Sequence, residues 1–252
     1  MSRCYVNVLL CLLCVGCSSK KEIDSAKLQS AEEMYTSGCS LLKKSSFEDA
    51  AEIFKKIESL HPYSSKACDG QLLAAYSYFM SSNYSDAMRE LDIFLRYHSS
   101  HALVPYAVYL RAMCLYVQTS TPERDQQVSQ DARQAFAEII NRYPNTPYAE
   151  DSMKRIVILD DTIASHEMEV GKFYQRKKNM LAAVGRYNFI VDYLRCSPRI
   201  VEANYRIIEC YQYDGLKDEA VPVYEAMKKN FPNNPWTIKA KTLMSKEQKQ
   251  NK

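Results

Sequence analysis

The residues of this 252-residue chain that could do chemistry are its 9 cysteines and 4 histidines. Cys11, Cys14 and Cys17 follow the spacing C-x-x-C-x-x-C, which could hold a metal ion through thiolates. The residues between them are Leu, Val and Gly, and this stretch contains no histidine or charged residue. Because a metal-bound thiolate needs polar neighbours, we expect no metal site here.

The first 17 residues instead have the parts of an export signal. Arg3 supplies a positive charge, residues 5–15 are almost all apolar, and Gly16 and Cys17 follow. This apolar run is shorter than the roughly 20 residues that span a bilayer. The ending Leu13-Cys14-Val15-Gly16-Cys17 resembles a bacterial lipoprotein signal, in which the last Cys is acylated. We therefore predict that residues 1–16 are a cleaved signal peptide and that Cys17 is the lipidation site.

The acyl chains would anchor the protein without a membrane-spanning helix. Two or more chains on Cys17 give stable attachment, whereas one chain binds marginally. Ser18, rather than Asp, follows the cysteine, which is typical of sorting to the outer membrane. We expect residues 17–30 to form the acylated N-terminus and a tether. The predicted location is the outer membrane, lipid-anchored and facing the periplasm.

Charge and histidine placement give little support to nucleic-acid binding or catalysis. Cleavage after residue 16 removes one charged residue, Arg3, so the formal charge falls from +3 to +2, too small to imply a nucleic-acid partner. His61 and His98 occupy equivalent places in two repeats, and His166-Glu167 lacks the second histidine of a zinc protease motif. Six isolated Gly cannot form a phosphate loop. We therefore predict no catalytic residue, no metal site, no cofactor and no enzyme activity.

The elements that position all these residues follow from an internal repeat. The pattern Ala-x-x-x-aromatic/Leu-x-x-apolar occurs five times, at Ala50/Phe54/Ile57, Ala87/Leu91/Phe94, Ala132/Phe136/Ile139, Ala183/Tyr187/Ile190 and Ala220/Tyr224/Met227. The i, i+4, i+7 spacing places each trio on one helix face. Small residues lie upstream of most trios, and the pattern resembles the tetratricopeptide repeat of two antiparallel helices. We predict an all-α fold, a right-handed superhelix of five tetratricopeptide-like helix pairs with a concave groove.

The repeat spacing also predicts the domain organisation. Five units cover about residues 31–67, 68–104, 105–148, 149–200 and 201–238, and residues 239–252 form a Lys-rich flexible tail. The third unit gains a polar loop at 119–130, and the fourth contains one long helix over 149–174 that starts near Pro147. Pro222 should delay or kink the second helix of the fifth unit.

The cysteines after residue 17 are spread at about one per unit, at Cys39, Cys68, Cys114, Cys196 and Cys210. We interpret them as free thiols that pack like small apolar residues. A disulfide is the alternative, although cysteines in consecutive repeats seldom come close enough, and no pair can be named.

Aromatic residues on the first helices are candidates for binding a peptide. Slots expected to face the groove hold Tyr35, Tyr76, Phe79, Tyr109 and Tyr116. An extended peptide with aromatic side chains would suit such a surface. The alternative is that these rings are core between repeats. Arg96, Arg111 and Arg155 could pair with a peptide carboxylate, or could simply be solvated.

An ordered series of stretches resembles the BamD (ComL-like) family of outer-membrane assembly lipoproteins over about residues 31–235. These stretches are Leu60-His61-Pro62-Tyr63, Ala74-Ala75-Tyr76, Phe94-Leu95-Arg96, Val108 to Met113, Glu123-Arg124-Asp125, Ala132 to Phe136, Tyr143 to Tyr148 and Met153 to Leu159. The chain departs from the family at Ala112, where Gly is usual, in lacking the Gly expected near 177–179, and in a shorter insertion. These departures concern loop geometry rather than the fold.

The resemblance implies a non-enzymatic scaffold in β-barrel assembly. It implies docking on the periplasmic POTRA domains of the barrel subunit, with Arg186 at the contact, and reception of unfolded outer-membrane proteins by the N-terminal repeats. Other lipoproteins are further candidate partners. A solvated Arg186 is the simpler alternative at that position. For the whole protein, the rival hypothesis is a periplasmic repeat adaptor that coordinates cell-wall or envelope-constriction enzymes.

Overall fold

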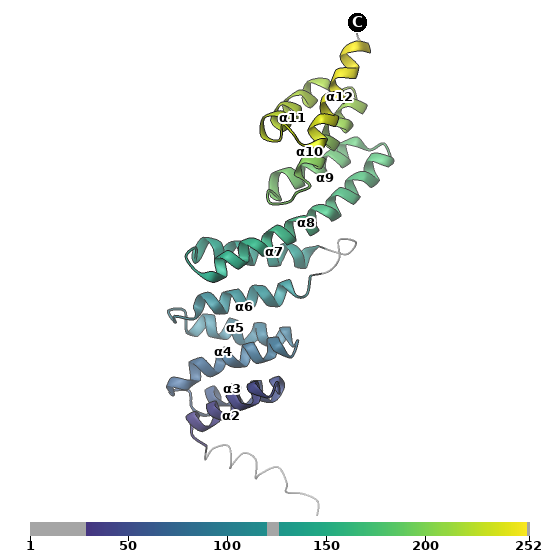
Figure 1. Cartoon of the computed structure of the whole chain (residues 1–252). Coiled ribbons are helices and arrows are strands. Elements are labelled where there is room, and N and C mark those ends of the chain that lie inside the picture. Colours follow the sequence, from purple (N-terminus) through teal and green to yellow (C-terminus); the bar gives the residue numbers. More distant parts are fainter. Residues whose placement is uncertain (1–28, 120–125, 251–252) are drawn as a thin grey trace, which may run out of the picture. The chain divides into compact units, whose positions relative to one another are not determined.

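The computed structural model describes residues 29–119 and 126–250, which form eleven α-helices and no strand (Figure 1). The helices are α2 (Ala31–Lys43), α3 (Phe47–Leu60), α4 (Ser65–Met80), α5 (Tyr84–Tyr97), α6 (Val104–Tyr116), α7 (Gln127–Arg142), α8 (Pro147–Arg176), α9 (Met180–Tyr193), α10 (Ile200–Tyr213), α11 (Lys217–Asn230) and α12 (Pro235–Gln250). The predicted signal peptide and Cys17 lie outside the described residues. The all-α helix-pair fold predicted from the repeats is confirmed.

The chain divides after Ser77 into two compact units. In the first unit, α2 packs against α3, and the buried core is formed by Met34, Ala50, Phe54, Ile57, Ala67 and Ala74. In the second unit, each helix from α5 to α11 contacts the next one in the chain, and α12 packs against both α10 and α11. This neighbour-to-neighbour packing is what a repeat architecture requires, because no single pair can bury its own apolar faces.

The residues of the repeated pattern are the centres of these cores. The first two members of four trios, including Ala50 with Phe54 and Ala183 with Tyr187, are fully buried. In the fifth trio, Ala220 and Met227 are buried and Tyr224 is partly buried. The pattern therefore identified the inner face of the second helix in each pair.

The long helix predicted for the fourth unit is α8, which has 30 residues. Pro147 is its first residue, and the Thr146 hydroxyl caps the helix by accepting a hydrogen bond from the Ala149 N–H at 3.3 Å. Its first half contributes Ile156 and Leu159 to a core with α6 and α7. Its second half contributes to a core with α9 and α10. The helix is long because it serves two successive cores.

Two expectations about chain boundaries are wrong, and a third is wrong in part. The flexible tail expected from residue 239 continues α12, because Ala240 is buried and Leu243 and Met244 pack onto α10 and α11. Helix α11 begins at Lys217, before Pro222, so the proline does not delay its start, and a kink at Pro222 stays a prediction. Helix α7 begins at Gln127, so the loop expected over 119–130 ends earlier.

Four turns between paired helices share one backbone conformation. Ser45, Ser82, Lys178 and Gly215 have positive φ angles of 60°, 62°, 60° and 74°. At Lys178, its own N–H bonds to the Gln175 carbonyl and the next N–H bonds to the Tyr174 carbonyl, the Schellman pattern that ends a helix. The Gly that seemed missing near 177–179 is replaced by Lys178 in the left-handed conformation, at a cost of about 1 kcal/mol.

Close approach between paired helices depends on glycine at two positions. A Cβ added to Gly38 would lie 2.7 Å from the Phe54 ring, and one added to Gly171 would lie 2.7 Å from the Tyr187 Cζ. Both rings are fully buried, so neither can move aside cheaply. A Cβ added to Gly185 on α9 would meet nothing within 4 Å.

Gly171→Ala should therefore lower the free energy of unfolding by about 1–3 kcal/mol, because the methyl group overpacks the contact with Tyr187. Gly185→Ala is the matched control on the neighbouring helix, and it should raise stability by up to about 1 kcal/mol through helix propensity. Urea denaturation followed by circular dichroism measures both. Equal stability of the two variants would contradict the packing argument.

Candidate partner-binding sites

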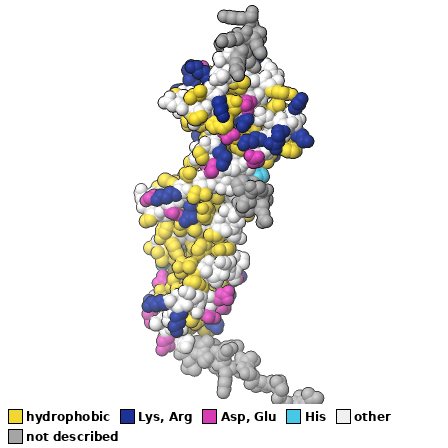
Figure 2. Space-filling view, turned by 45° about the vertical axis from the view of Figure 1, so that its right-hand side comes forward, with side chains coloured by type: hydrophobic (Ala, Val, Ile, Leu, Met, Phe, Trp, Pro, Cys, Tyr) yellow, Lys and Arg dark blue, Asp and Glu magenta, His cyan; other side chains and the backbone are white. Residues whose placement is uncertain are grey.

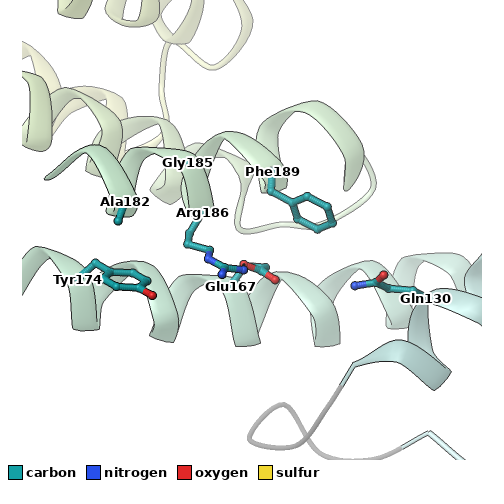
Figure 3. Close-up of a pocket in the computed structure, with 7 residues that line it drawn as sticks. All are labelled: Gln130, Glu167, Tyr174, Ala182, Gly185, Arg186 and Phe189. Carbon is teal, nitrogen blue, oxygen red and sulfur yellow. The ribbon is translucent and has the colours of Figure 1, made fainter. Parts of the chain in front are cut away.

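Arg186 on α9 lies in a surface pocket of about 430 Å³ in the second unit. The pocket is lined by Gln130, Glu167, Tyr174, Ala182, Gly185, Arg186 and Phe189. Figure 3 shows Arg186 extending from α9 toward Glu167 on α8, with Tyr174 and Phe189 on either side. The Arg186 Nη1 lies 3.2 Å from the Glu167 Oε2.

The ion pair between Glu167 and Arg186 has one buried member and one partly exposed member. Glu167 follows the buried residues Ile163 and Ala164 by one helical turn, so it lies on the inner face of α8, and its side chain is 8% exposed. A carboxylate with so little water requires a cation, which Arg186 supplies. The Arg186 side chain is 46% exposed, so its guanidinium can donate further hydrogen bonds to a second acid from outside. A merely solvated Arg186, the simpler alternative, therefore leaves out the ion pair with Glu167.

Asp160 is a second buried carboxylate on the inner face of α8, two helical turns before Glu167. It too is paired with an arginine from a neighbouring helix. It is fully buried, and it accepts hydrogen bonds from Arg133 of α7 and from the Cys196 N–H, the latter at 3.2 Å. Arg133 Nη2 also donates to the Tyr193 carbonyl at 2.9 Å. This network joins α7 and α8 to the end of α9. The repeat pattern did not indicate this network, because the partners of Asp160 lie far from it in the sequence.

The first unit contains two of the predicted groove residues. The ring of Tyr35 packs edge-on against Phe54 with centroids 5.8 Å apart, and Lys66 lies 4.7 Å from its centroid. Burial raises the pKa of Tyr35. Tyr76 is half-buried on α4. Tyr35 therefore belongs to the packing of its unit, as the core alternative predicted.

The second unit contains Phe79, Tyr109 and Tyr116. Phe79 lies 5.8 Å from Tyr84, and both Tyr109 and Tyr116 pack against Phe136 at 6.2 and 5.9 Å between centroids. Hydrophobic side chains gather on one face over α5 and α6 (Figure 2). The three rings are half-buried, so they contribute to packing and keep part of their surface accessible.

The arginines predicted to bind a peptide carboxylate differ in their surroundings. Arg155 donates to Asp151 and lies 4.7 Å from the centroid of Tyr116. Arg111 Nε donates to Asp92 at 2.8 Å. Arg96 is exposed. Two of the three are therefore already paired with acids of their own unit.

The five cysteines in the described part of the chain are free. Burial raises the pKa of Cys114 and of Cys210 to about 12, so these two thiols stay protonated at neutral pH. Cys196 is exposed, so the expectation that it packs is wrong. It lies in the turn after α9, where its N–H rather than its thiol makes the structural contact.

The described residues contain no group of three or more His, Cys, Asp or Glu side chains that could hold a metal ion. Within the same residues, no helix combines the length and apolarity needed to cross a bilayer.

One polar cluster makes stability depend on pH. The Tyr109 hydroxyl donates to the Asp151 Oδ2 at 2.5 Å, and Arg155 donates to the same oxygen. Burial alone would raise the pKa of Asp151, but the bonds from Tyr109 and Arg155 outweigh it and lower the pKa. A lowered pKa in the folded state stabilises the fold above the unfolded pKa of about 4, and this contribution is lost as pH falls through the folded-state pKa.

Asp151→Asn should therefore lower the free energy of unfolding at neutral pH by about 1 kcal/mol, a modest value because the carboxylate is partly exposed. The difference from the unaltered chain should shrink below about pH 4. Urea denaturation across this range measures it. Glu150→Gln, which removes a neighbouring acid whose ion pair with Lys154 is exposed to solvent, should change stability much less than Asp151→Asn does. A loss for Asp151→Asn that does not vary with pH would refute the assignment.

Comparison with known proteins places the chain in a family. Residues 27–226 match the family model described as YfiO, outer membrane lipoprotein. A relative from Rickettsia prowazekii, named outer membrane protein assembly factor BamD, is 35% identical over 233 residues, which cover 92% of each chain. Relatives of the same name from Caulobacter vibrioides and Neisseria meningitidis serogroup A are each 29% identical, over 94% and 95% of this chain and 79% and 95% of their own. Their name describes an assembly factor rather than an enzyme. With four fifths of its length matched, this chain belongs to the YfiO family of outer-membrane lipoproteins.

Proposed function

We propose that this chain is a non-enzymatic lipoprotein scaffold that assists the assembly of β-barrel proteins at the outer membrane. The observation that carries the proposal is the match to assembly factors named BamD across almost the whole chain. The paired-helix repeats support it, because they offer long surfaces for protein partners. Attachment through acylated Cys17 is part of the proposal.

The proposed main partner is the barrel subunit of the assembly machinery, bound through its POTRA domains at the surface around Arg186. Support comes from the exposed half of the Arg186 side chain and from the exposed apolar residues Phe173, Leu181 and Tyr193 on the same two helices. Other lipoproteins are further candidate partners.

The proposed substrates are unfolded outer-membrane proteins, which would contact accessible edges of Tyr35 and Tyr76 in the first unit and of Phe79, Tyr109 and Tyr116 in the second. All five aromatic residues are half-buried. Each ring therefore keeps an accessible part that a partner ring could contact. A pull-down with the tagged, acylated protein tests the overall role. Recovery of a POTRA-bearing barrel subunit supports the proposal, and recovery of cell-wall enzymes instead would favour the adaptor alternative.

Arg186→Glu should weaken binding to purified POTRA domains about tenfold or more, because it removes the cation and places a second acid beside Glu167. Arg186→Gln, which removes the charge without this repulsion, should weaken binding in the same direction. Calorimetric titration measures the affinities, and melting temperatures check folding. Arg195→Glu, in the turn after α9, is the control. Unchanged affinity in both Arg186 variants would sink the assignment of this residue.

Tyr76→Ala should reduce photo-crosslinking of unfolded barrel-protein segments to the first unit by several-fold, because a ring contributes large contact area at small entropic cost. Tyr63→Ala removes a fully exposed tyrosine from the same unit and should leave crosslinking near the unaltered level. Equal crosslinking for Tyr76→Ala and the unaltered chain would argue against a substrate contact at this ring.

A further inference from the structure

The lining of the pocket beside Arg186 includes a residue without a side chain. Gly185 is exposed on α9, and a Cβ built on it would meet nothing within 4 Å. Neither its backbone conformation nor close packing requires glycine at this position, unlike Gly171 on α8. Ala would be the better helix former by up to about 1 kcal/mol. What glycine provides here is open space within the lining of the pocket.

Two aromatic side chains line this space together with the polar Gln130, Glu167 and Arg186, and they continue toward the surface. Tyr174 and Phe189 line the pocket from α8 and α9 (Figure 3). The ring of Tyr174 packs against Phe173 with centroids 5.6 Å apart, and that of Phe189 packs against Tyr193 at 5.2 Å. Phe173 and Tyr193 are both exposed. Apolar surface therefore continues from inside the pocket to its rim.

The charge of Arg186 favours an acidic group at the opening of the pocket. The structure gives Arg186 one ion pair, from Nη1 to Glu167, and this acid is nearly closed to water. The exposed part of the guanidinium therefore presents donors to the pocket opening, and the nearest acid is unavailable to an incoming cation. A carboxylate is the complementary group.

We propose that the pocket over Gly185 receives an apolar side chain of a partner segment whose neighbouring carboxylate pairs with Arg186. The apolar side chain lies between Tyr174 and Phe189, and the carboxylate remains near the rim. This inference rests on the proposed docking function and adds a second requirement for partner recognition. A partner with an acid but no adjacent apolar side chain would pair with Arg186 and leave the pocket empty. The recognised partner is therefore a protein segment with an acid next to a residue such as Leu.

Gly185→Leu tests the pocket, because the added Cβ meets no atom within 4 Å and the rest of the side chain would occupy the open space. In the full chain, affinity for purified POTRA domains should fall at least tenfold, the range expected for excluding one buried apolar side chain. The melting temperature should not fall. Ala226→Leu adds a leucine at an exposed position of α11 and should leave the affinity unchanged. Full affinity for Gly185→Leu would overturn the proposal.

A second measurement separates this inference from the choice of partner. A short peptide with glutamate next to photo-leucine should label the chain at Tyr174, Gly185 or Phe189, as mapped by mass spectrometry. A matched peptide with glutamine should label these residues at least tenfold less, as should the first peptide on Gly185→Leu. If POTRA domains fail to bind the unaltered chain, the proposed partner is wrong, and the peptide labelling still decides the pocket. Equal labelling by both peptides, or attachment elsewhere, would overturn it.

Discussion

The contact of a small residue on one helix with a large ring on the next is the constraint on which the repeats depend. Gly38 against Phe54 and Gly171 against Tyr187 leave no room for a Cβ, so the paired helices approach closely. The rings fill the space, and the outer faces of each pair are covered by the next helix. Because interiors are close-packed, these contacts set the positions of the neighbouring side chains, including those at the surface.

The long helix α8 carries this constraint from the cores to the candidate docking site. It shares one core with α7 and another with α9, and its inner face contains Asp160 and Glu167, seven residues apart. Each buried acid is compensated by an arginine on a neighbouring helix, Arg133 or Arg186. A buried acid costs too much free energy to remain unpaired. The interior therefore determines where these guanidiniums reach the surface.

Much of the fold could be predicted because the repeat pattern is periodic, and periodicity reports which face of a helix is buried. The same reasoning failed for α12, where a few apolar residues among many lysines pack well once α10 and α11 cover them. It also failed for Cys196, because residues in turns follow no periodicity. For the rings of Tyr109 and Tyr116, it left core and surface roles open, and both rings are half-buried against Phe136.

The sequence by itself determined the helix-pair repeat, the long α8, the lack of a glycine-rich loop and the resemblance to outer-membrane assembly lipoproteins, all of which depend on residue order. Only the tertiary structure decided that Glu167 pairs with Arg186, that Gly185, Tyr174 and Phe189 line one pocket, and that Asp151 accepts hydrogen bonds from both Tyr109 and Arg155. The reason is physical. Most of these groups belong to different helices, and their contacts exist only after close packing has set the distance between those helices.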